Sequence, residues 1–272
     1  MSDEHSHKSN LLFVLLPPVV LCALDFFIMS LQPQSKAISH FSFAVLVAQL
    51  LCLLVFLKGK ICPGQRGRLI KMNLGLLLYW FAWLFVSLFS NYNYVITDIV
   101  ALCGIGTTFA IWQQPIKDRI LQRSILILGI MVAMLGVITY LLVFFSFSIN
   151  YLPLFNPFAQ FLAGTILANL MLIAAENRLH NFMGLLPMTM LLALFLNAVV
   201  VLGLLFYAYF NAIEFPNELA WALYFTLHLL MLLILGVFLL KEKALNYPIL
   251  LILLFISTSL PLWATFASNS FK

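Results

Sequence analysis

The sequence predicts an all-α, polytopic integral membrane protein, and three observations support this fold class. Of the 272 residues, 64% are hydrophobic and 8% are charged, whereas a soluble domain carries roughly 25% charged residues. The hydrophobic residues form repeated runs of about 20, which is the length needed to cross the hydrocarbon core of a bilayer. These runs are continuous and do not alternate with period two. Because hydrocarbon offers no hydrogen-bond partners, helices are favoured over a β-barrel.

Nine transmembrane spans are expected from the hydrophobic runs. They cover residues 11–32, 38–57, 72–90, 95–112, 124–147, 153–174, 183–210, 218–240 and 247–267. The first ten residues are polar, so we expect residues 1–10 to form a solvated tail. Residues 11–272 are then a single transmembrane domain.

The basic residues predict how this domain is oriented. Short loops rich in Lys and Arg remain on the cytoplasmic side of a membrane. Twelve of the fourteen basic residues fall before the first span or in alternate gaps, and Lys36 and Lys272 are the exceptions. The twelve are Lys8, Lys58, Lys60, Arg66, Arg68, Lys71, Lys117, Arg119, Arg123, Arg178, Lys241 and Lys243. An odd number of spans therefore predicts a cytoplasmic N-terminus and an outside C-terminus.

The longest gap between spans, Lys58 to Lys71, is expected to be a basic turn. It contains Pro63, Gly64 and Gly67, which commonly interrupt regular structure. Its sequence lacks the GK[ST] ending of a phosphate-binding loop. We therefore expect it to contact lipid headgroups.

Polar positions that coincide at an offset of 120 residues leave open an internal duplication. The coinciding pairs are Gln49 with Asn169, Lys58 with Arg178, Asn91 with Asn211, and Asp98 with Glu218. The halves would be residues 11–123 and 124–246, followed by a final helix at 247–267. Each half would hold four helices and run in the same direction, as in transporters built from parallel repeats.

Four polar residues are candidates for a substrate- or proton-binding site: Asp25, Asp98, Glu218 and His228. A charged side chain within the hydrocarbon costs roughly 2.5–3.5 kcal/mol on insertion scales, so such residues usually face the bundle or a wet cavity. By helical rise, all four belong to the outer half of the membrane. They could surround an outward-opening polar cavity, where His228 could exchange a proton near neutral pH.

Structural explanations compete with this interpretation. Asp98 and Glu218 are also expected at helix N-termini, where the helix dipole favours negative charge. Asp25 could make a structural hydrogen bond to a neighbouring helix, and His228 could be a packing residue with satisfied nitrogens. Secondary candidates are Gln49, Thr165, Asn169 and Asn197, which are also typical of hydrogen bonds between helices.

No cofactor or metal site is expected from the sequence. The four cysteines are scattered and form no CxxC motif, which argues against zinc binding. A haem held by two histidines needs a pair inside the membrane, and only His228 falls well inside a span. The net charge of +5 comes from loops, which favours anionic lipid headgroups rather than nucleic acid as a partner.

A small transporter or permease of the plasma (inner) membrane is the preferred functional interpretation, with a small-molecule or lipid substrate. One alternative is a non-enzymatic subunit or assembly factor with a membrane protein partner. Another is a lipid-active enzyme, because nine spans with an inside N-terminus match the outline of the polyprenyl transferases. Their two aspartate-rich motifs are absent, since Asp25 and Asp98 are single and lie on the wrong side for a cytoplasmic diphosphate.

The topology is tested by reporters fused behind Lys272. Alkaline phosphatase, which is active only outside the cytoplasm, should be active there, whereas green fluorescent protein should be dark. The same reporters placed after Lys58 should give the opposite pattern. Fluorescence behind Lys272 without phosphatase activity would show an even number of spans or an inverted orientation.

Overall fold

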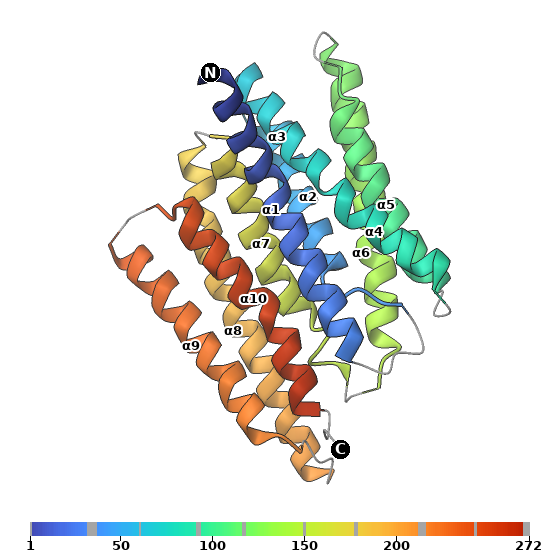
Figure 1. Ribbon diagram of the computed structural model, residues 1–272, viewed down its shortest axis with the longest axis vertical. Coiled ribbons are helices and arrows are strands. Elements are labelled where there is room, and N and C mark those ends of the chain that lie inside the picture. Colours follow the sequence, from blue (N-terminus) through green and yellow to red (C-terminus); the bar gives the residue numbers. More distant parts are fainter. Residues whose placement is uncertain are drawn as a thin grey trace.

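The computed structural model describes residues 2–31, 37–59, 61–90, 94–115, 118–148, 151–176, 179–211, 216–241 and 244–268. Within these residues the chain forms ten helices (Figure 1). They are α1 (Ser2–Leu31), α2 (Ser42–Lys58), α3 (Pro63–Gly75), α4 (Leu77–Phe89), α5 (Val95–Trp112), α6 (Arg119–Phe145), α7 (Pro157–Ala174), α8 (His180–Phe210), α9 (Glu218–Leu240) and α10 (Tyr247–Ser268). Within these residues there is no strand.

The helices account for the nine expected spans. Among the described residues, eight segments are long and apolar enough to cross a membrane, and α2 is a shorter apolar helix. Helices α3 and α4 count as one segment, Pro63–Phe89, because they are interrupted only at Leu76. The predicted all-α membrane bundle is thereby confirmed. Figure 1 shows the start of α1 and the end of α10 at opposite ends of the bundle, as an odd number of spans requires.

The prediction that the basic gap after α2 is a turn was wrong over most of its length. Helix α3 begins at Pro63, where proline is favoured because the first helical position needs no N–H donor. The Gln65 side chain accepts a hydrogen bond from the Cys62 backbone N–H at 3.4 Å, which supports this helix start. Proline therefore starts a helix here rather than interrupting one.

The first helix is longer than expected. It begins at Ser2, so residues 2–10, which we expected to form a polar tail, continue the helix of the first span. Once a helix has formed, each added residue gains one backbone hydrogen bond without a new nucleation step. Of the basic residues, Lys36, Lys60, Lys117, Arg178, Lys243 and Lys272 lie outside the described residues.

Helices α2 and α7 form the centre of the bundle. Nearly all side chains of α7 are buried, and the two helices approach so closely at Gly164 that a Cβ there would overlap the Ala44 carbonyl oxygen. Small residues permit such contacts in membranes, where van der Waals packing rather than hydrophobic burial holds helices together. Other helices surround α2, so it can be shorter than a helix that faces lipid along its whole length.

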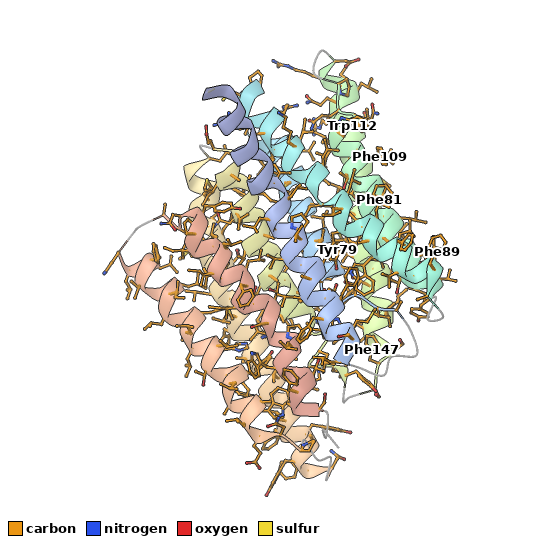
Figure 2. The ribbon with its side chains drawn as sticks, viewed as in Figure 1. Tyr79, Phe81, Phe89, Phe109, Trp112 and Phe147 are labelled. Atoms are coloured by element: carbon orange, nitrogen blue, oxygen red, sulfur yellow. The ribbon has the colours of Figure 1, made fainter. Side chains whose placement is uncertain are left out.

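The outer faces of the bundle are apolar. Figure 2 shows Phe81, Phe89, Phe109 and Trp112 along α4 and α5 at one side of the molecule, and all four are exposed. Large exposed hydrophobic side chains on this scale mark a surface that contacts another apolar phase. We therefore expect this face of α4 and α5 to contact lipid.

Hydrogen bonds join the connections that carry basic residues at one end of the bundle. Arg66 donates from Nη1 to Gln114 Oε1 at 3.0 Å, beside the turn between α5 and α6. Arg68 pairs with Glu176 at 3.0 Å and donates to the Ala175 carbonyl oxygen at 3.1 Å, just after α7. These contacts place the starts of α3 and α6 and the end of α7 together. We call this the basic end of the bundle.

The central helix contact is tested with two glycines. Gly164→Ala should destabilise the protein by about 1–3 kcal/mol, because the new methyl group meets backbone that cannot move away easily. Gly236→Ala on α9 is the matched control, since a Cβ there meets no neighbouring atom. Thermal unfolding in detergent should show a lower midpoint for the first variant and an equal or higher one for the second. Equal midpoints for both variants would contradict the close approach of α2 and α7.

Candidate functional site

The polar site is built around a short non-helical segment that precedes α2. Residues 37–41 precede the first turn of α2 and are not helical, yet all five side chains are buried. At membrane depth such a backbone is tolerated only where protein or a water-lined cavity supplies partners. Side chains supply them here. Thr97 at the start of α5 donates to the Ala37 carbonyl oxygen at 2.8 Å, and Ser39 Oγ accepts from the backbone N–H groups of Phe41 and Ser42.

The Asp25 carboxylate of α1 is the main acceptor for this segment. Its Oδ1 accepts from the backbone N–H of His40 and from His40 Nδ1, each at 2.9 Å. Its Oδ2 accepts from Ser39 Oγ at 2.7 Å and from Tyr79 OH of α4 at 2.9 Å. Ser39 Oγ and Tyr79 OH also lie within hydrogen-bond reach of each other, so two hydroxyl protons serve three contacts, and a Ser39–Tyr79 bond forms only when one hydroxyl turns away from Asp25. An ionised carboxylate can accept about four hydrogen bonds, so Asp25 is saturated although its exposed fraction is 0%.

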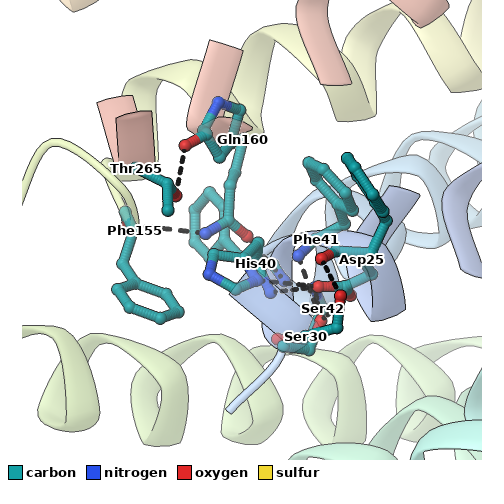
Figure 3. Close-up of polar contacts among 12 residues, drawn as sticks. Asp25, Ser30, His40, Phe41, Ser42, Phe155, Gln160 and Thr265 are labelled. Carbon is teal, nitrogen blue, oxygen red and sulfur yellow. Dashed lines mark hydrogen bonds and ion pairs between the residues drawn. The ribbon is translucent and has the colours of Figure 1, made fainter. Parts of the chain in front are cut away.

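Figure 3 shows the His40 ring beside Asp25, and one of its ring nitrogens has no partner in the part of the chain that the structure describes. Since Nδ1 lies against an acceptor oxygen, we assign the ring proton to Nδ1. The opposite nitrogen, Nε2, is buried and has no hydrogen-bond partner among the described residues. The ring stacks on Phe155 with centroids 4.5 Å apart and an interplanar angle of 13°. A carboxylate that orients a neutral imidazole through Nδ1 leaves the lone pair of Nε2 as an acceptor.

Phe155 lies just before α7, as His40 lies just before α2. Helix α2 begins at Ser42 and α7 at Pro157, 115 residues later. At the same interval, His40 corresponds to Phe155 and Asp25 corresponds to Tyr140 of α6. The contacts correspond too, because Tyr140 OH donates to the Phe155 carbonyl oxygen at 3.0 Å, as Asp25 binds the His40 backbone.

This correspondence places the His40–Phe155 stack between two similar helix pairs, α1–α2 and α6–α7. Gln160 of α7 strengthens the junction, because its Oε1 accepts from the Phe43 N–H at 3.1 Å and its Nε2 donates to Tyr140 OH. The interval of 115 differs from the offset of 120 that the polar residues of the sequence had indicated. The difference arises because helix starts, rather than single polar residues, are the features that match.

Two of the predicted site residues lie at helix starts at the end of the bundle opposite the basic end. Asp98 is in the first turn of α5, half-buried, and its buried Oδ1 has no partner among the described residues. It follows Thr97, which binds the segment at Ala37, so Asp98 belongs to the surroundings of the Asp25 site. Glu218 is exposed at the first residue of α9, where the helix dipole favours its charge.

His228 belongs to a second polar network with its own partners. Asn197 of α8 is its centre, because Asn197 Oδ1 accepts from Asn156 Nδ2 at 2.7 Å and Nδ2 contacts Tyr224 OH and His228 Nε2. His228 Nδ1 lies 2.9 Å from the Tyr224 carbonyl oxygen. The ring proton on Nδ1 then leaves Nε2 to accept from Asn197, so both ring nitrogens are used. Phe155 contacts the first network and Asn156 the second, and these two residues are neighbours in the chain.

Two of the secondary candidates, Gln49 and Thr165, make hydrogen bonds within the bundle. Gln49 Nε2 donates to the Gly104 carbonyl oxygen at 3.2 Å and to Thr108 Oγ1 at 2.7 Å. Thr165 bonds the Phe161 carbonyl oxygen of its own helix. Asn169 is buried with its Oδ1 unpartnered in the described structure. Among the described residues there is no group of three His, Cys, Asp or Glu side chains that could hold a metal ion.

Sequence reasoning missed several residues of this site. The candidates that the sequence indicates do not include His40, Ser39, Tyr79 or Phe155. The signal that could have found His40 is its distance from any expected basic loop, together with a nearby buried carboxylate. Tyr79 and Phe155 lie in apolar surroundings, where no sequence pattern separates them from packing residues.

Comparison with known proteins agrees with the architecture. A Haemophilus influenzae protein described as an uncharacterized protein is 40% identical over 267 residues, which cover 98% of this chain and 100% of that protein. No solved structure matches the chain. A family described as an integral membrane domain matches residues 4–266, and the chain belongs to that family.

Proposed function

We propose that this protein is a proton-coupled transporter of the plasma membrane, with Asp25 and His40 as its proton-binding pair. One observation carries the proposal. A buried imidazole is oriented by a buried carboxylate, and its second nitrogen has no partner in the described part of the chain. Buried polar groups without partners are rare in proteins and point to a bound water, a ligand or a chemical role.

The position of this pair supports transport. Many transporters place their site at the junction of repeated halves, next to helices that are interrupted within the membrane. The His40–Phe155 stack joins the helix pairs α1–α2 and α6–α7, and residues 37–41 form a buried non-helical segment before α2. Following the basic loops, the N-terminus is cytoplasmic, and the buried pair lies nearer the outer end of the bundle. Asp98 and Glu218 lie at the same end and would attract cations or protons to it.

An enzyme that uses a serine nucleophile is less well supported by the same geometry. In a nucleophile–base pair the hydroxyl lies within hydrogen-bond reach of the histidine base. Ser39 Oγ instead bonds Asp25 Oδ2, Tyr79 and two backbone N–H groups. Ser39 therefore organises the backbone of the segment. The role as a subunit or assembly factor remains the alternative, and it predicts that no flux depends on His40.

Proton flux tests the proposal through two matched histidine variants. In His40→Asn, the amide can still donate to Asp25 from the place of Nδ1, but the group at Nε2 is lost. In His228→Gln, an amide takes the place of Nε2 and can still bond Asn197. Proteoliposomes with a trapped pH-sensitive dye are given an imposed pH gradient and fractions of a host-cell metabolite extract. Wild type and His228→Gln should show solute-dependent proton flux, and His40→Asn should show at least a tenfold lower rate.

Thermal unfolding of each variant in detergent serves as the control for folding. A folded His40→Asn protein with wild-type flux would exclude His40 from coupling. If no fraction produced flux with the wild-type protein, the subunit or assembly-factor role would take the place of transport.

A further inference from the structure

One face of α3 and α4 carries a row of buried polar atoms that have no hydrogen-bond partner among the described residues. The atoms are Asn73 Oδ1, Trp80 Nε1, Trp83 Nε1 and Ser87 Oγ. Asn73, Trp80 and Ser87 are spaced seven residues apart, which is nearly two helical turns, so they share one face. Trp83 lies one turn from its neighbours in the row. All four side chains are at most 1% exposed.

Neighbouring helices add unpartnered atoms beside this row. The Trp80 ring lies against Gly104 of α5, where a Cβ would overlap it. Gln49 of α2 bonds the carbonyl oxygen of that glycine through Nε2, while its Oε1 is unpartnered in the described structure. Helices α4 and α5 are antiparallel, so the contact between residues 80 and 104 brings Ser87 opposite residues 97–98. Asp98 Oδ1, also unpartnered, therefore lies at the same level as Ser87.

Leaving these groups without partners would be costly. A buried donor or acceptor that loses its hydrogen bond costs about 1–3 kcal/mol, and the lipid on the outside of the bundle offers no partner. The row mixes groups that only donate, the two indole N–H groups, with carbonyl oxygens that only accept and a hydroxyl that does both. Water can donate and accept at once, and ordered water commonly satisfies buried groups of this kind. A rigid charged ligand would match only part of the row.

We propose that this face of α3 and α4, together with Gln49 and Asp98, binds a file of water molecules and forms a hydrated path through the bundle. From Asn73 to Ser87 the row rises about 21 Å along the helix axis, which is most of the roughly 30 Å hydrocarbon core. The path starts beside Asp98 at the end opposite the basic end. It passes next to the Asp25 site, because Tyr79 precedes Trp80 and Phe26, which follows Asp25, packs on Trp83 with ring centroids 5.4 Å apart.

Radiolytic footprinting of the wild-type protein in lipid nanodiscs tests the path. X-rays split water into hydroxyl radicals that modify side chains next to bound water, and tryptophan reacts readily. Trp80 and Trp83 should be modified several-fold faster, after correction for intrinsic reactivity, than Tyr224. Tyr224 is the control because it is 0% exposed and its hydroxyl is bonded to Asn197. Modification of both tryptophans at or below the rate of Tyr224 would overturn the proposal.

A variant tests whether the polar atoms share one file. Trp83→Phe removes one N–H while keeping an aromatic ring, so modification of Trp80 should fall by several-fold and thermal stability should change little. An unchanged rate at Trp80 would show that Trp83 takes no part in holding the water. Footprinting does not depend on transport. Labelled tryptophans without proton flux would therefore contradict the proposed function alone, and flux with unlabelled tryptophans would contradict the hydrated path alone.

Discussion

The structure depends on how the non-helical segment before α2 finds hydrogen-bond partners inside a bundle that is surrounded by lipid. Hydrocarbon supplies none, and an unpaired backbone group costs several kcal/mol. Asp25 meets this need with both carboxylate oxygens, which accept from one backbone N–H and from three side chains. This single group thereby holds α1, the segment and α4 together. Once the carboxylate has oriented His40 through Nδ1, the other nitrogen is the one part of the ring left for chemistry.

The helix pair α6 and α7 holds the other side of the site. Tyr140 of α6 donates to the Phe155 carbonyl oxygen, and the Phe155 ring stacks on His40. This pair thus supplies an apolar wall for the His40 ring. The network of Asn197 and His228 shows the contrast, since its histidine uses both nitrogens and acts as a structural hydrogen-bonding residue.

The number and order of the spans could be predicted because run length and loop charge both report on the bilayer, which acts along the whole chain. The helix that begins at Pro63 could not be predicted, because proline is common both at the first position of helices and in turns. Asp25 was identified because a single carboxylate within an apolar run is costly and needs an explanation. We grouped Asp25 with His228 because both were expected in the same half of the membrane. Depth in the membrane does not determine which helices are neighbours. The sequence did not indicate His40 as a site residue, because its hydrogen bond to Asp25 is a tertiary contact. Such a contact leaves no periodic pattern in the sequence.

Nitrogen NMR of His40 tests the account most directly. The protein is labelled with ¹⁵N-histidine, studied in liposomes, and the His40 signals are assigned by their absence in His40→Asn. The account predicts that Nδ1 carries the ring proton and is hydrogen bonded, while Nε2 carries none. A ring proton on Nε2 with none on Nδ1 would contradict it.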